Sequence, residues 1–113
     1  MSTITTHVLD TALGLPAPGV PVTLSRRDDT GLVAIGSGTT DADGRPRDLL
    51  PAGTTIDDGT YALEFDTSRY FAESKRTTFF PHVTIVFQVE GASAHYHVPL
   101  LLSPFGYSTY RGS

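Results

Sequence analysis

The sequence predicts an all-β protein, an antiparallel sandwich of roughly seven to eight strands with one short helix. Apolar and polar residues alternate with a period of two in segment after segment, which is typical of strands that bury one face. The 113 residues include 11 glycines and 8 prolines, which suit short strands joined by tight turns. This length favours one domain that spans residues 1–113.

The expected elements follow one another along the chain. The strands are expected at residues 4–9, 20–25, 32–35, 61–66, 83–89 and 95–102, with 32–35 partly buried. Between them we expect a solvated hairpin loop at 26–31 and turns at 41–44 and 57–59, where Asp and Gly cluster. A short helix is expected from about residue 68 to 74, with Asp66 or Thr67 as its N-cap.

The composition excludes several classes of protein. There are no cysteines, which excludes disulfides and thiolate metal sites. The net charge is -4 and the basic residues are scattered, so no nucleic-acid footprint is visible. No apolar run approaches the ~20 residues of a membrane span. The first residues show no secretory signal and the last are not a peroxisomal signal, so a cytoplasmic location is expected by default.

Strand parity predicts that three of the four histidines leave the core. Adjacent side chains on a strand point to opposite faces, so His95 and His97 point outward if Tyr96 points inward. The same count turns His7 outward. A lone surface histidine, such as His82, is usually only solvated, but histidines that converge on one face indicate a catalytic or binding site.

A metal site is an open alternative for the same residues. His95 and His97 have the His-x-His spacing of metal ligands, and a third histidine could complete a tri-histidine zinc site. No Asp, Glu or Cys is placed as an obvious further ligand. We therefore favour acid–base chemistry, with no metal and no organic cofactor.

Three segments carry a family resemblance. They are Ile4-Thr5-Thr6-His7-Val8-Leu9-Asp10-Thr11-Ala12-Leu13-Gly14, Thr40-Asp41-Ala42-Asp43-Gly44-Arg45 and the final Tyr110-Arg111-Gly112-Ser113. In this order they resemble the 5-hydroxyisourate hydrolases, the transthyretin-related enzymes of purine breakdown. The resemblance covers essentially the whole chain. It implies a transthyretin-like sandwich that forms a homotetramer, a dimer of dimers, with active sites in a channel at the dimer–dimer interface.

The resemblance also implies an activity. These enzymes hydrolyse 5-hydroxyisourate, the unstable product of urate oxidation, to 2-oxo-4-hydroxy-4-carboxy-5-ureidoimidazoline. Opening the ring at an amide bond needs an activated water and a stabilised oxyanion. By resemblance, His97 assisted by His7 activates the water, and Arg45 holds the ring carbonyls and stabilises the charge on oxygen. Arg47 has the same parity as Arg45 and stays open as an alternative, and His95 is expected to contact the substrate.

The last residues are expected to hold the substrate too. An end that carries an aromatic, an arginine and a hydroxyl suggests a terminus that is placed and used, although termini usually fray. By resemblance, Tyr110, Arg111 and Ser113 pack beside His97 and keep the ring in place. Ser113 is not expected to be a nucleophile, because no G-x-S-x-G elbow surrounds it.

A transthyretin-like carrier without catalysis is the alternative function. Transthyretin shares the fold and binds thyroid hormone in the same channel, but it lacks the equivalents of His7, Arg45 and His97 and the Y-R-G-S end. This chain has all four features. A β-sandwich adhesion or interaction module has no support beyond the fold class.

Overall fold

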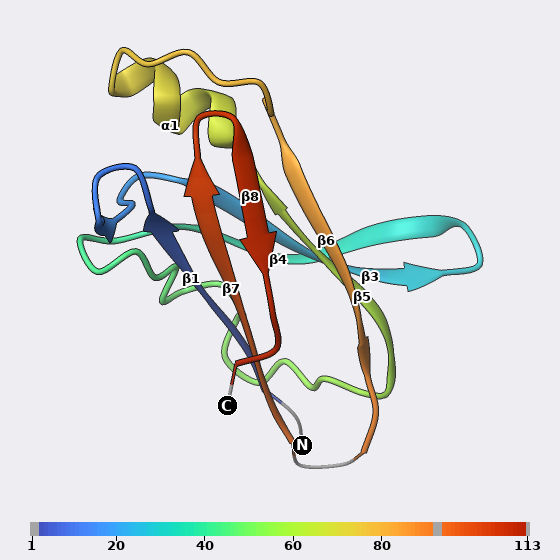
Figure 1. The fold of residues 1–113 in the computed structure, drawn as a ribbon. Helices are drawn as coiled ribbons and strands as arrows, with labels where there is room; N and C mark the ends of the chain where they lie inside the picture. The colour runs from blue at the N-terminus through green and yellow to red at the C-terminus, as the bar shows by residue number, and fades with distance from the viewer. Residues whose placement is uncertain (1–2, 92–93, 113) are drawn as a thin grey trace.

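A computed structural model describes residues 3–91 and 94–112 as two four-stranded sheets that pack face to face (Figure 1). The first sheet contains β1 (Thr3–Asp10), β2 (Leu15–Pro16), β7 (His95–Ser103) and β8 (Gly106–Thr109), in the order β2-β1-β7-β8. The second contains β3 (Pro21–Asp28), β4 (Gly31–Thr39), β5 (Gly59–Phe65) and β6 (Val83–Val89), in the order β4-β3-β5-β6. The predicted all-β sandwich with one short helix is confirmed.

The helix α1 (Thr67–Glu73) lies at one end of the sandwich (Figure 1). The side chain of Asp66 accepts a hydrogen bond from the backbone N–H of Arg69 and caps the first turn, as predicted. Tyr70 and Phe71 are the apolar residues that the helix buries against the sheets. No helix in the described residues is long and apolar enough to span a membrane.

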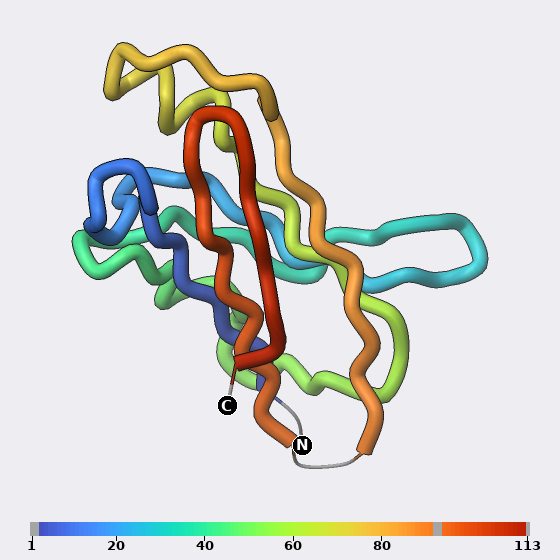
Figure 2. Tube along the Cα trace, viewed as in Figure 1, coloured from blue at the N-terminus to red at the C-terminus, as the bar shows by residue number. Residues whose placement is uncertain are grey.

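The hairpin between β3 and β4 differs from the prediction. Instead of a loop over residues 26–31, β3 continues to Asp28 and β4 begins at Gly31. The turn closes through the Asp28 carboxylate, which accepts hydrogen bonds from the N–H and hydroxyl of Thr30. The hairpin projects beyond the rest of the sandwich (Figure 2), so Leu32 and Val33 are 45% and 44% exposed rather than partly buried. The predicted partial burial is thus wrong for these two residues, which lie toward the tip of the hairpin, and is confirmed for Ile35, which packs against the core.

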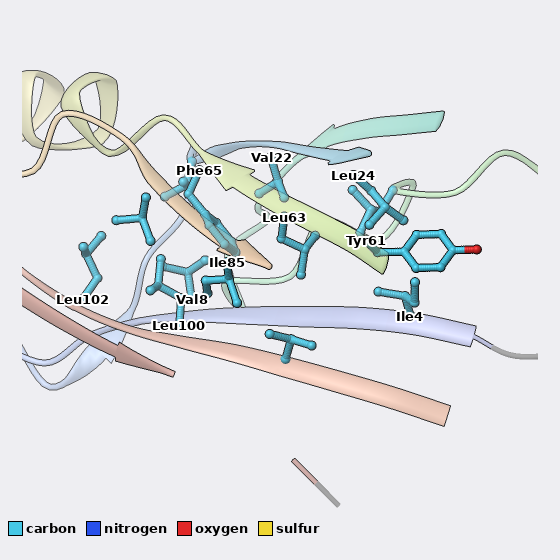
Figure 3. Packing of buried hydrophobic residues seen from close by; sticks show 14 of the residues in the cluster. Ile4, Val8, Val22, Leu24, Tyr61, Leu63, Phe65, Ile85, Leu100 and Leu102 are labelled. Atoms are coloured by element: carbon cyan, nitrogen blue, oxygen red, sulfur yellow. The ribbon is translucent and has the colours of Figure 1, made fainter. Parts of the chain in front are cut away.

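The core lies between the two sheets and confirms the parity argument. Ile4 and Val8 of β1 are 3% and 0% exposed, and Leu100 of β7 is fully buried. Figure 3 shows these side chains facing those of Leu63 and Ile85 from the second sheet. Burying a side chain of this size contributes about 1.5–3 kcal/mol to folding. The opposite face of β1 and β7 is therefore free to carry other chemistry.

The pairing of β1 with β7 is parallel, whereas the other strand pairs of the described residues are antiparallel. The two strands come from opposite ends of the chain, so no hairpin dictates their relative direction. Their register sets Thr3 beside His95, Thr5 beside His97 and onward to Asp10 beside Leu102. The outward residues of one strand thus lie next to the outward residues of the other.

A buried carboxylate joins the end of β1 to α1. Asp10 is 1% exposed, and its Oδ2 accepts hydrogen bonds from Arg76 Nη2 at 2.6 Å and from the Tyr70 hydroxyl at 2.7 Å. Burial alone would raise the pKa of Asp10, but the hydrogen bonds from Arg76, Tyr70 and the N–H of Leu13 outweigh it and lower that pKa. Burial and the neighbouring carboxylate raise the pKa of Tyr70 to about 12. The cluster fixes the helix to the first sheet.

Candidate active site

The outer face of the first sheet carries three histidines. His7 projects from β1, and His95 and His97 project from β7. Tyr96, between the last two, is 4% exposed, whereas His97 is half-buried and His95 exposed. The His95 and His97 rings lie nearly parallel, with their centroids 6.4 Å apart. The predicted outward orientation of the three histidines is therefore confirmed.

Arg45 reaches this region from a tight loop over residues 41–45. Asp41 organises the loop, because its Oδ1 accepts hydrogen bonds from the N–H groups of Asp43 and Arg45 at 2.9 and 3.1 Å. Gly44 adopts a φ of +79° and brings no side chain into the tight space beside β1. A Cβ there would lie 2.4 Å from the carbonyl oxygen of Val8 and 3.1 Å from Cδ2 of His7. Only glycine lets the loop approach β1 this closely.

The structure separates the two nearby arginines. The Nε of Arg47 donates to Asp41 Oδ2 at 2.6 Å, and its Nη2 donates to Asp43 Oδ2 at 3.1 Å. The Arg45 guanidinium has no carboxylate partner among the residues that the structure describes. Arg47 thus holds its own loop together, whereas Arg45, unpaired with any carboxylate of residues 3–91 and 94–112, can donate to a ligand.

His97 sits where a neutral imidazole is favoured. Burial, followed by the positive charge of Arg45 and the neighbouring His95 and His7, lowers the pKa of His97 below its usual 6.5. Its Nδ1 lies 2.8 Å from the Thr5 hydroxyl. The Nε2 of His7 is buried and has no hydrogen-bond partner among the described residues. Within the described part of the chain, a neutral base, a ring nitrogen without a hydrogen-bond partner and a guanidinium without a carboxylate partner thus belong to one face.

Gly112 packs against His97 and was not among the predicted site residues. Its N–H donates to the carbonyl oxygen of His97 at 2.7 Å, and the two residues form an isolated bridge beyond the end of β8. A Cβ at Gly112 would lie 2.7 Å from Cδ2 of the His97 ring. The glycine within the terminal Y-R-G-S was the available signal, since a glycine marks a place where another group approaches the backbone closely.

Arg111 lies on the other side of β7 from His97, which differs from the expected packing beside His97. Because Gly112 pairs with His97, the preceding residue turns toward the opposite face. The Arg111 guanidinium lies over the Tyr96 ring, 4.5 Å from its centroid. With Tyr110, which is 58% exposed, it lines a groove of ≈ 230 Å³ beside β6. Ser113 lies outside the described residues.

The open metal alternative finds no cluster in this face. Among residues 3–91 and 94–112, no group of three His, Asp, Glu or Cys side chains is arranged to hold a metal ion. His82 is exposed and precedes β6 in the second sheet. The acid–base role of the other histidines stays a prediction that chelation tests.

The arrangement of strands, loop and terminus is that of a known family. The model of the HIUase/Transthyretin family matches residues 4–112. The chain belongs to this family. A 5-hydroxyisourate hydrolase of Caulobacter vibrioides is 48% identical over 117 residues, which cover 100% of both chains.

Two solved structures of the family resemble this one. The 5-hydroxyisourate hydrolase of Klebsiella pneumoniae is 38% identical with a TM-score of 0.83, and the match covers 100% of this chain and 94% of that one. The transthyretin of Sparus aurata is 32% identical with a TM-score of 0.88, and the match covers 96% and 95%. The backbone therefore does not separate a hydrolase from a transthyretin, and the residues of the outer face have to do so.

Proposed function

We propose that this chain hydrolyses 5-hydroxyisourate in urate degradation. One observation carries the proposal: Arg45, without a carboxylate partner among the described residues, is close enough to His97 to lower the pKa of that histidine. Hydrolysis of an uncharged amide needs a neutral base and a cation that act on the same carbonyl group. The high identity to a relative named 5-hydroxyisourate hydrolase supports the same substrate.

Arg45, His97 and His7 have different roles in the proposed hydrolysis. Arg45 donates to the ring carbonyls and stabilises the oxyanion that forms when water attacks the carbonyl carbon. His97, neutral at pH 7, takes a proton from that water, and His7 assists from β1. The carbon–nitrogen bond then breaks, and His97 returns its proton to the leaving nitrogen. Neither a metal nor an organic cofactor takes part.

The C-terminal residues contribute in different ways. Gly112 supports the His97 ring from so short a distance that the site has no room for a larger residue there. Arg111 is held over Tyr96 and keeps the terminal segment in place, so its contribution to the substrate is indirect. Tyr110, and Ser113 beyond the described residues, remain proposed substrate contacts.

A second copy of the chain is proposed to cover the site. In one chain the groove beside Thr5, Arg45 and Leu50 has ≈ 360 Å³ and is open to solvent. Exclusion of water would strengthen the electrostatic effect of Arg45 on the oxyanion. We therefore propose a homotetramer, a dimer of dimers, with this face in the channel between dimers. Light scattering tests the assembly, and a monodisperse monomer at micromolar concentration would contradict it.

The deciding experiment follows the ultraviolet absorbance of 5-hydroxyisourate. We expect decay well above the spontaneous rate, and loss of that acceleration in His97→Asn with an unchanged thermal melt. A carrier, the function that the likeness to transthyretin favours, would leave the spontaneous rate unchanged while binding the compound. Dialysis against a chelator should leave the rate as it was. The cytoplasmic location is a prediction that a fluorescent fusion tests.

A further inference from the structure

A row of four side chains on the outer face alternates between β1 and β7 and ends at His97. Thr3 Oγ1 lies 2.5 Å from Nδ1 of His95. The Nε2 of the same ring lies 3.2 Å from Thr5 Oγ1, and this hydroxyl lies 2.8 Å from Nδ1 of His97. Each distance is within hydrogen-bond range, so the row is continuous from Thr3 to His97.

The parallel register produces this row. Thr3 pairs with His95 and Thr5 pairs with His97, and all four side chains point away from the core. The nearly parallel imidazoles leave room for one hydroxyl between them. Thr5 is that hydroxyl, and it faces a nitrogen of each ring.

A single hydroxyl cannot serve both rings in the same way. It carries one proton, so it can donate to one imidazole nitrogen and must accept from the other. If Thr5 donates to Nε2 of His95, it accepts from an N–H at Nδ1 of His97. The Nε2 of His97 is then without a proton and can act as a base. In the reverse arrangement Nε2 carries the proton, and His97 cannot take one from water.

We propose that Thr5 is a positioning residue, which holds His97 in the tautomer with its proton on Nδ1, and that His95 orients the Thr5 hydroxyl rather than contacting the substrate. The expected effect of Thr5 on turnover rests on the proposed hydrolysis. In hydrolases with a Ser-His-Asp triad a carboxylate selects the tautomer, and the wrong tautomer there costs about 10⁴ in turnover. No carboxylate of the described residues hydrogen-bonds to His7, His95 or His97. A hydroxyl takes that position here.

The neighbours of His97 agree with a neutral orienting group. Among the residues that the structure describes, the charged or titratable side chains that face it are Arg45 from the 41–45 loop, His7 from β1 and His95 from β7, and all three disfavour a positive charge on the ring. On the opposite edge of the ring lies Gly112, which brings no charge. A hydroxyl selects the tautomer without adding a negative charge, which would stabilise the protonated ring and raise its pKa.

The test compares Thr5→Val, which keeps the shape and removes the hydroxyl, with Thr5→Ser, which keeps the hydroxyl. Loss of one hydrogen bond to a partly exposed ring should lower kcat by about tenfold and change KM little. The acid limb of the kcat/KM profile should move to lower pH, because the protonated ring loses an acceptor. Thr5→Ser should restore both. Thr60→Val, which removes a cross-strand threonine hydroxyl from the second sheet, is the matched control and should resemble the unmodified protein.

Long-range ¹H–¹⁵N spectra of histidine-labelled protein give a readout that needs no substrate. We expect the His97 proton on Nδ1 in the unmodified protein and in Thr5→Ser, and a mixture of tautomers in Thr5→Val. A proton on Nε2 in the unmodified protein, or the same tautomer in all three proteins, would overturn the proposal even if hydrolysis is rapid. If the unmodified protein fails to hydrolyse 5-hydroxyisourate, the proposed function fails, and the spectra still decide the role of Thr5.

Discussion

Replacement of Gly112 by alanine should disturb catalysis without disturbing the fold. The added Cβ would lie 2.7 Å from Cδ2 and 3.3 Å from Cγ of His97, whereas ordinary contact begins near 3.4 Å. The ring or the terminal segment must therefore move by about 0.7 Å, and a 1 Å misplacement can cost ~100-fold in rate. We expect kcat to fall by about tenfold or more. The φ of Gly112 is not in the left-handed region, so the backbone itself tolerates alanine.

The assay measures kcat and KM from the absorbance decay of 5-hydroxyisourate, with a thermal melt beside it. Gly106→Ala is the control, because Gly106 has an ordinary φ and its nearest neighbour, Ser103 Oγ, would lie 3.7 Å from the new Cβ. The melting temperatures of both variants should match that of the unmodified protein. A Gly112→Ala variant with kcat within about twofold of the control would refute the idea that this glycine makes room for His97.

Further predictions concern charge, pH and the terminus. Arg45→Ala should lower kcat/KM by about 100-fold or more in steady-state assays. Arg47→Ala should lower kcat/KM only slightly. Activity should rise with pH through a limb below 6.5, since His97 works unprotonated, and Arg45→Gln should move that limb to higher pH by removing a positive charge. Asp10→Asn should cost about 3 kcal/mol in urea unfolding by leaving a largely buried arginine unpaired. Because the pKa of Asp10 is lowered from 3.8, its stabilisation is full above that pH and is lost as pH falls through the lowered pKa. Deletion of residues 110–113 should leave a folded oligomer with at least ~100-fold lower kcat/KM. Near-normal activity of the truncated protein would show that the terminal motif has no catalytic role.

Local sequence patterns predicted the fold correctly where the position of a residue within its own strand or helix determines its burial. The alternation in β1 and β7 gave the right buried face, and Asp66 gave the right helix start. The exposure of Leu32 and Val33 could not be read locally, because it depends on whether the other sheet extends over the hairpin. The parallel pairing of β1 with β7 likewise depends on contacts between the two ends of the chain.

The sequence predicted several of the residues in the site, but it did not predict which partners they contact. Parity placed His7 and His97 on one face, yet only the structure shows Arg47 bound to carboxylates while Arg45 has no such partner among the described residues. Arg111 was expected beside His97, and its position over Tyr96 follows from a register that the sequence does not state. Thr5 carries no signal in the sequence, because a threonine on a strand is ordinary until its partner across the sheet is known.

The parallel contact between β1 and β7 also has a consequence for biosynthesis. Thr5 and His97 are 92 residues apart in the chain, so the first strand leaves the ribosome long before its neighbour exists. Contacts with such separation form slowly, because a large loop must close before any of them contributes. The β3–β4 hairpin can assemble early, while β1 waits with one edge unpaired. Chains interrupted before β7 therefore carry an exposed strand edge that favours aggregation, and the supply of active protein should respond to chaperones that shield this edge.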